Sequence, residues 1–385
     1  MPDTRDEAVA LDAADPLAGW RDEFLIADPD VAYLDGSSLG MMPLRTIERV
    51  EALMRDEWAG GLIGSWDHWL ELPQRVGDEL AVIIGAGPGE VVVHDSVTIN
   101  LYQLVHAALV LRPDRRVIAI AASEFPTDRY VVDGIARSQG CEVRHGFERL
   151  DDVAVAVRSL VDYRMAELRD LVAETARAEA AGALMIWDLS HAVGLLPVDL
   201  HGAGVEMAVG CTYKYLNGGP GAPGFSYVAA HLIDQIDQPI WGWFGQVDQF
   251  TMGPEYVPRR DVGRLLIGTP GIIGLTAARS GIELSAAAGI VEIAAKARAL
   301  TAYGLARCEA LGLDCPGPTD PARRGGHFSV RHPDAASITR VLAADHGVIA
   351  DFREPDLVRL GCSPLTTRFT DVHDGTLAIA RLTAP

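Results

Sequence analysis

The chain has 385 residues, of which 49% are apolar and 22% are charged, and its formal net charge is −20 with a pI near 4.9. A chain of this length exceeds what one hydrophobic core usually supports, so we expect a large domain and a smaller one. The excess of carboxylates repels phosphate backbones and anionic membranes, which argues against binding to nucleic acid or to a membrane surface.

The cysteines and the N-terminal segment narrow the class further. The five cysteines are odd in number and show no CxxC or Cys/His spacing, so neither a disulfide framework nor a metal site is expected. The first residues, MPDTRDEAVALDAADPLAGW, are acidic and lack an apolar signal core, and no apolar run is long enough to span a bilayer. These features predict a cytoplasmic protein.

Short apolar runs alternate with amphipathic stretches between residues 80 and 230. The expected helices include the patterns at Leu101–Ala108 and Leu168–Ala176. The expected strands are Glu90–His94, Arg116–Ala121, Cys141–Arg144, Val153–Val157, Ala183–Trp187, Met207–Val209 and Gly224–Val228. Such alternation predicts an α/β protein whose mostly parallel sheet lies between helices. In such sheets, ligands bind at the carboxyl ends of the strands.

The pattern changes after Pro270. A long alanine-rich helical segment is expected over Ile272–Ala310, followed by weaker strand signals at Phe328–Arg331, Val348–Asp351 and Val358–Leu360. This order predicts a smaller α+β domain. We therefore expect an N-terminal arm at 1–45 that packs on the small domain, a large domain at 46–271 and a small C-terminal domain at 272–385.

The segment Trp187–Val228 carries the most specific chemistry. Asp188 ends an apolar run, and Lys214 follows 26 residues later between Tyr213 and Tyr215, before a glycine-rich turn. An acid that can face a pyridinium nitrogen and a lysine that can form a Schiff base are the two groups that a pyridoxal phosphate (PLP) enzyme needs. The alternative is a buried strand with a helix cap, followed by a surface lysine. Asp188 fits that alternative, but Lys214 does not, because a solvated lysine gains nothing from two tyrosines.

Two further clusters follow predicted strands. In His94–Leu101 (HDSVTINL), Thr98 can cap a helix whose free amides would bind the PLP phosphate, and the alternative is a plain N-cap. In Ser123–Tyr130 (SEFPTDRY), Phe125 can lie against the cofactor ring and Asp128 can reach a ring substituent. The alternative for this second cluster is a polar loop with a core phenylalanine.

In this order and spacing, the motifs of the chain resemble those of the kynureninase family, PLP enzymes of fold type I in the aminotransferase class V group. The resemblance runs nearly from end to end. Its motifs are YLDGSSLGMMP at Tyr33–Pro43, EWAGGLIGSW at Glu57–Trp66, IGAGPGEVVVHDSVTINLYQL at Ile84–Leu104, FPTDRY, WDLSHAVG, GCTYKYLNGGPGAP, GWFGQVDQF at Gly242–Phe250, GTPGI at Gly268–Ile272 and VIADFREPDLVRLGCSPLTTRF at Val348–Phe369.

The resemblance implies a role for each matching residue. Lys214 resembles the Schiff-base lysine, Asp188 the partner of the ring nitrogen, and Tyr213 a proton donor beside the phosphate. The remaining cofactor contacts that it implies are Val97, Thr98, Phe125, Asp128, Ser159, His191, Trp243 and Thr269. Trp243 and Thr269 match residues that a partner subunit contributes, which implies a homodimer with shared active sites.

On the substrate side, the resemblance implies that Arg359 binds the α-carboxylate and that Ser38 and Phe244 also contact the substrate. A planar fork of donors suits bidentate carboxylate binding. The alternative for Arg359 is a surface ion pair with Asp351 or Glu354.

The activity implied is a PLP-dependent hydrolysis of the Cβ–Cγ bond of L-kynurenine or a substituted kynurenine, giving L-alanine and an anthranilate in tryptophan catabolism. The chain departs from the family pattern in its substrate-side motifs, at Ser37, Met165, Gln246, Cys362 and Thr366. A related enzyme that acts on another γ-keto or β-substituted amino acid therefore stays open. So do a class V aminotransferase and a cysteine desulfurase that uses Cys362 as its thiol. A PLP-binding regulator would need a basic DNA-binding module, which this acidic chain lacks.

Overall fold

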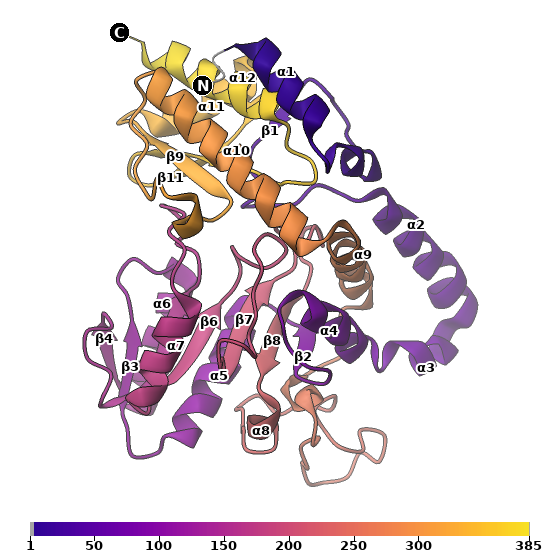
Figure 1. Cartoon of the computed structure of the whole chain (residues 1–385). Helices are drawn as coiled ribbons and strands as arrows, with labels where there is room; N and C mark the ends of the chain where they lie inside the picture. Colours follow the sequence, from indigo (N-terminus) through magenta and orange to yellow (C-terminus); the bar gives the residue numbers. More distant parts are fainter. Residues whose placement is uncertain (1–3, 385) are drawn as a thin grey trace.

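A seven-stranded sheet, called the large sheet below, forms the lower part of the molecule in Figure 1. The computed structural model describes residues 4–384, and the strand order is β2-β8-β7-β6-β5-β3-β4. Neighbouring strands are parallel except where β8 pairs with β2 and β7. The strands are β2 (Val91–His94), β3 (Val117–Ile120), β4 (Glu142–His145), β5 (Val153–Ser159), β6 (Leu184–Asp188), β7 (Met207–Cys211) and β8 (Gly224–Val228). All seven expected strands are confirmed, with ends that differ by at most two residues.

Helices cover both faces of the large sheet, which explains why its strands read as continuous apolar runs. Val91 and Val93 enter one core with α4 and α9, whereas Val92 enters the opposite core with α5 and α6. The helices that follow or flank these strands are α4 (Leu72–Ile83), α5 (Val97–Leu111), α6 (Pro126–Gln139), α7 (Leu171–Ala180), α8 (Ala230–Ile233) and the 3-10 turn η4 (Val262–Leu265).

The C-terminal part contains a second, three-stranded antiparallel sheet, called the small sheet, in the upper part of Figure 1. Its order is β11-β12-β9, and a separate pair joins β1 to β10 in parallel. The elements of this part are η5 (Pro321–Arg323), β9 (His327–Arg331), α11 (Ala335–Asp345), β10 (Val348–Ile349), β11 (Asp351–Arg353), β12 (Leu357–Gly361) and α12 (Phe369–Thr383). The expected strands at Phe328–Arg331 and Val358–Leu360 are therefore confirmed, whereas the one expected at Val348–Asp351 is divided between β10 and β11, which pair in different sheets.

The expected helical segment over Ile272–Ala310 is broken. Helix α9 (Ile272–Ala288) ends and α10 (Ile290–Ala310) begins at Gly289, whose φ is +85°. This backbone region is open to glycine and costly for other residues, so one glycine turns an alanine-rich run into two helices.

The N-terminal arm runs across the C-terminal elements and then along the side of the molecule (Figure 1). Helix α1 (Arg5–Ala14) packs on α12, where the carboxylate of Asp12 accepts hydrogen bonds from the amides of Phe369 and Thr370. Asp15 forms a buried 2.6 Å ion pair with Lys296 of α10. The arm continues through η1 (Ala18–Glu23) and β1 (Ala32–Tyr33), and the chain then runs through α2 (Leu44–Ala52), the π-helix η2 (Leu53–Gly61), η3 (Leu62–Ser65) and α3 (Trp66–Trp69). Within residues 4–384, no helix is long and apolar enough to cross a membrane.

Candidate active site

One cavity at the carboxyl edge of the large sheet gathers most of the predicted cofactor residues. Segments that follow β2, β3, β6 and β7 converge there, as the topology of a parallel sheet predicts. The predicted residues that line it are Val97, Thr98, Phe125, Asp128, Asp188, His191, Tyr213 and Lys214. Ser96, Thr127, Ser190, Cys211, Ala222 and Gly224 complete the wall.

Lys214 is the reactive amine of this cavity. Only 8% of its surface is exposed, and its Nζ lies 3.2 Å from Nε2 of His191. The ring centroids of Tyr213 and Phe125 are 5.7 and 6.0 Å from the same nitrogen. Burial lowers the pKa of Lys214, which favours the neutral, nucleophilic amine. A surface lysine, the alternative weighed from the sequence, is therefore excluded.

Two carboxyl groups face each other at the second end of the cavity. Asp188 ends β6, and its Oδ1 accepts hydrogen bonds from the amide (2.8 Å) and the hydroxyl (2.6 Å) of Ser190. Burial, followed by the charges of Asp188 and Glu124, raises the pKa of Asp128 well above its usual range. Oδ2 of Asp128 is buried and has no hydrogen-bond partner in the described chain. This end of the cavity can therefore take a group that donates a proton, such as a pyridinium.

The third end is the N-terminus of α5, which can hold an anion through free amides and the helix dipole. The cap is Ser96, whose hydroxyl accepts from the amide of Ile99, so the expected capping role of Thr98 is wrong by two positions. Thr98 instead faces the cavity from the first turn of the helix. Gly224 lies against this turn, because a Cβ there would be 3.0 Å from the amide nitrogen of Val97. A side chain at Gly224 would fill the space beside these amides.

These three ends fit PLP as a set. An amine stands where the aldehyde carbon would bind, carboxyl groups where the ring nitrogen would lie, and a helix N-terminus where the phosphate would lie. The unpartnered oxygen of Asp128 is a feature that such a ligand would satisfy.

Arg359 lies on the opposite, small-sheet side, in the middle of β12. It is fully buried, and its Nη2 donates to Asp351 Oδ2 (2.7 Å) and Ser38 Oγ (2.9 Å), while Nη1 donates to the carbonyl of Tyr163 (2.8 Å). The alternative considered from the sequence was a surface ion pair of Arg359 with Asp351 or Glu354. Arg359 does pair with Asp351, but its side chain is buried. Arg353 shares the same Asp351 carboxylate at 2.5 Å.

The arm reaches both sides of this site. Its Ser38 bonds to Arg359, and burial raises the pKa of Asp35 to about 6. The amide of Gly40 donates to the carbonyl of Tyr213 at 2.9 Å, and a Cβ at Gly40 would collide with the carbonyl oxygen of Lys214. The N-terminal arm is therefore part of the wall of the site.

Besides Arg359 and Ser38, four predicted site residues do not line the Lys214 cavity of the same chain. Ser159 is at the end of β5, where its amide donates to the buried carboxylate of Glu124 (3.0 Å). Trp243 lines an exposed groove with Gln246 and Tyr256. Phe244 is 1% exposed and packs between aromatic rings in the core under α5.

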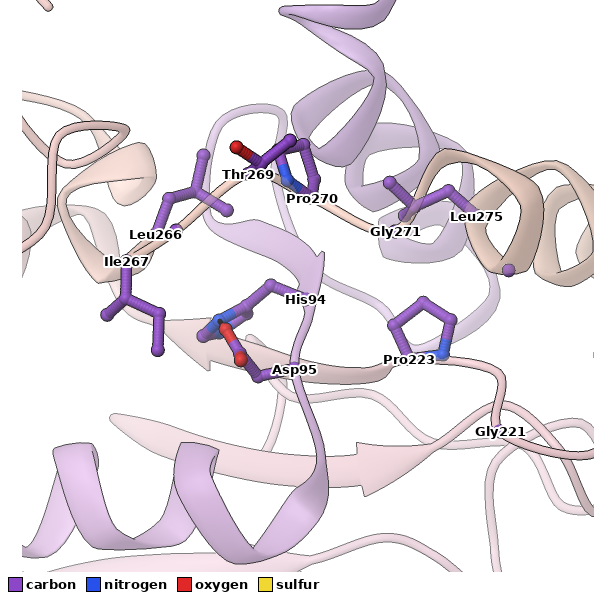
Figure 2. Close-up of a pocket in the computed structure, with 12 residues that line it drawn as sticks. His94, Asp95, Gly221, Pro223, Leu266, Ile267, Thr269, Pro270, Gly271 and Leu275 are labelled. Carbon is purple, nitrogen blue, oxygen red and sulfur yellow. Dashed lines mark hydrogen bonds and ion pairs between the residues drawn. The ribbon is translucent and has the colours of Figure 1, made fainter.

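The fourth, Thr269, lines a separate cavity, shown in Figure 2. The loop segment that carries Thr269 and Pro270 forms one side of that cavity, and Asp95 and Pro223 lie on the other side.

The positions that depart from the family pattern have mostly structural contacts. Gln246 stabilises its own loop, because its Oε1 accepts a 2.6 Å hydrogen bond from the amide of Val257. Cys362 and Thr366 are buried, and burial raises the pKa of Cys362 to about 12. Ser37 is fully buried beside Gly361, and the amide of Met165 donates to Asp162. A thiol held neutral in the core argues against a desulfurase that uses Cys362.

The sequence reasoning missed several residues of the site. Ser96 is a serine just before a helix, the usual signal of an N-cap, but the prediction placed the cap two residues later, at Thr98. Tyr163, whose ring meets Phe125 at a centroid distance of 5.3 Å, and the buried Glu124 carried no such signal. Their importance arises from contacts between segments that are distant in the chain.

Comparisons with known proteins agree with this geometry. Residues 293–379 match the family model of the kynureninase C-terminal domain. A kynureninase of Pseudomonas fluorescens is 42% identical over 96% of this chain and 93% of its own length, and one of Burkholderia pseudomallei (strain 1106a) is 40% identical over the same shares. The solved structure of a cysteine desulfurase from Thermococcus onnurineus NA1 covers 94% of this chain and 97% of its own with a TM-score of 0.84, but at 16% identity it shares the fold alone. The chain belongs to the kynureninase family.

Proposed function

We propose that the protein is a PLP-dependent hydrolase that cleaves the Cβ–Cγ bond of L-kynurenine, or of a ring-substituted kynurenine, to give L-alanine and an anthranilate. The observation that carries the proposal is the buried Lys214 opposite Asp188, in a chain that is 42% identical to a named kynureninase over nearly its full length. The desulfurase-like neighbours share the fold at 16% identity or less, so they do not compete as a function.

PLP, when bound, supplies an electron sink for the carbanionic character that develops at the substrate carbons. Asp188 would face the ring nitrogen and favour its protonated form, which strengthens this sink. Lys214, whose pKa is lowered by burial, would hold the cofactor and could move protons at the substrate α-carbon. Tyr213 keeps its phenolic proton, because burial raises its pKa, and it can deliver that proton to the product. Arg359 orients the amino acid through its carboxylate.

The lysine content of the chain supports the assignment of Lys214 independently. The sequence contains only two lysines, Lys214 and Lys296. The ammonium of Lys296 is buried in its ion pair with Asp15 and does not line the cavity. Lys214 is therefore the one lysine side chain available to the aldehyde.

We also propose that the enzyme works as a homodimer whose two active sites are shared. Trp243 and Thr269 lie outside the Lys214 cavity of their own chain, as residues that serve a partner would. The segment 42–63, from the end of the arm through α2 and η2 into η3, exposes several large apolar side chains, which is typical of a surface covered by another chain. These residues are Met42, Leu44, Ile47, Met54, Trp58, Leu62 and Ile63.

The direct test is incubation of the PLP-loaded protein with L-kynurenine and with 3-hydroxy-L-kynurenine. We expect alanine and the matching anthranilate in equal amounts, identified by mass, with Lys214→Ala as the inactive control. Production of a keto acid instead of alanine would point to an aminotransferase. If neither kynurenine is cleaved while the bound cofactor keeps its absorbance, the proposal fails.

A further inference from the structure

We propose that His327 is a positioning residue of the substrate site, and that its imidazole donates a hydrogen bond to the α-carboxylate bound by Arg359. The inference deepens the proposed function, since it rests on an amino-acid substrate in this cavity. His327 carried no signal in the sequence, and its role follows from the register of the small sheet.

The register places His327 on the same face as Arg359. In the antiparallel pair of β9 and β12, His327 lies opposite Gly361 and Ser329 lies opposite Arg359. Opposed residues share a face of a sheet, and so do residues two apart along a strand. The imidazole and the guanidinium are therefore diagonal neighbours.

The ring of His327 lies behind His191, which lines the Lys214 cavity. It is fully buried, and neither of its ring nitrogens has a hydrogen-bond partner in the described chain. Its centroid is 6.0 Å from that of His191, whose Nε2 lies 3.2 Å from Lys214 Nζ. Buried polar groups are almost always hydrogen-bonded, so two unpartnered ring nitrogens this close to the cavity indicate a ligand partner.

The charges around His327 show which ligand fits. Burial lowers its pKa well below the usual range, and the neighbouring Arg359, Lys214 and Arg353 lower it further. The ring is therefore neutral, with one N–H to donate. Arg359 also keeps one buried donor, its Nε, without a partner in the described chain, so the two side chains together offer free donors to an anion. The α-carboxylate of an amino acid supplies one, and its second oxygen can accept from the imidazole while the first meets Arg359.

The test compares two ligands that differ only in this carboxylate. L-Alanine and L-alaninamide are titrated into the PLP-loaded enzyme, and binding is followed by the absorbance of the cofactor, which requires no carbon–carbon cleavage. We expect His327→Leu to raise the Kd of L-alanine about tenfold (about 1.4 kcal/mol) and that of L-alaninamide less than twofold. His327→Gln keeps a neutral donor and should restore most of the affinity for L-alanine.

The matched control is His106→Leu. His106 is also a buried histidine (8% exposed) with an unpartnered Nε2, but it lies in the middle of α5 beside Tyr102. It should leave the Kd of both ligands unchanged. With L-kynurenine, His327→Leu should raise KM more than it lowers kcat.

Three outcomes would overturn the proposal. Equal weakening of both ligands by His327→Leu means a purely structural role. An unchanged Kd for L-alanine with a lower kcat means that the ring serves the hydrolytic water instead. Failure of His327→Gln to restore L-alanine binding means that the donor is not what matters. If the unaltered enzyme binds L-alanine but does not cleave L-kynurenine, the proposed function fails, and the ratio of the two Kd values still decides the role of His327.

Discussion

The two sides of the site are built in different ways. On the Lys214 side, the strands of one sheet end at a common edge, and the backbone supplies much of the recognition, through the α5 amides and the close approach of Gly224. On the Arg359 side, side chains from the arm and from two strands of the small sheet bond to one another, and the backbone carbonyl of Tyr163 accepts from Arg359. The first side therefore depends on a few side chains with single roles, whereas the second depends on a network in which each loss is partly taken up by neighbours.

The sharpest test of the first side is Lys214→Ala. Because Lys296 is held by Asp15, no other lysine side chain can take over, and we expect turnover to be lost entirely. Borohydride reduction should fix the cofactor to the Lys214 peptide of the unaltered protein and to no peptide of the variant. Lys296→Ala is the matched control and should keep the adduct. An adduct on the Lys296 peptide would show that Lys214 is not the lysine that binds the cofactor.

Asp188→Ala should cost somewhat less. Loss of the carboxylate leaves the ring nitrogen without its partner, and removal of a preorganised electrostatic group typically lowers kcat roughly 100- to 1,000-fold. Asp170, which caps α7 at the surface, provides the control, and Asp170→Ala should keep kcat. The measurement is kcat with L-kynurenine. An Asp188→Ala enzyme with near-normal turnover would mean that Asp128 can replace it.

On the second side, Arg359→Lys should mainly raise KM, by roughly 10- to 100-fold, because an ammonium cannot reproduce the fork. Arg353→Lys should have a smaller effect, since Arg353 is partly exposed and shares Asp351 rather than holding it alone. Steady-state kinetics of the two variants rank the arginines directly. The opposite ranking would identify Arg353 as the main carboxylate-binding group.

The buried charges around Arg359 should also affect how the stability of the protein depends on pH. Burial raises the pKa of Asp35 to about 6, above its value in an unfolded chain. The stabilisation from the protonated form is thus complete below pH 4 and is lost as the pH rises through 6. Asp35→Asn is neutral at every pH and removes this loss. The Tm of the variant minus that of the unaltered protein should therefore increase by a few °C between pH 5 and pH 7, which corresponds to a change in the free energy of unfolding on the order of 2 kcal/mol. A constant difference in Tm across this range would show that Asp35 is ionised throughout.

The smallest effect on activity is expected at Cys362. Its thiol lies in the core of the small sheet and stays protonated, so Cys362→Ser should keep kcat and KM within about twofold. A buried hydroxyl without a partner should lower stability by roughly 1–3 kcal/mol, measured by urea unfolding. A folded but inactive Cys362→Ser variant would support the alternative of a cysteine desulfurase that uses Cys362 as its thiol.

The same contrast explains what the sequence could predict. The alternation of strands and helices and the groups that follow each strand placed the Lys214 side correctly, because these signals are local. The contacts of Arg359 were not predictable in this way, since its partners Ser38 and Tyr163 lie 321 and 196 residues away in the chain. His327 depends on a cross-strand register, and the break at Gly289 on a single φ angle, so neither has a periodic signature.

The contacts of the arm have a consequence for the order in which the enzyme becomes competent during synthesis. Ser38 and Gly40 precede the large sheet in the chain, whereas Arg359, to which Ser38 bonds, follows it. Every residue that lines the Lys214 cavity is therefore translated before Arg359. The contact between the arm and β12 can form only after the small sheet has been synthesised.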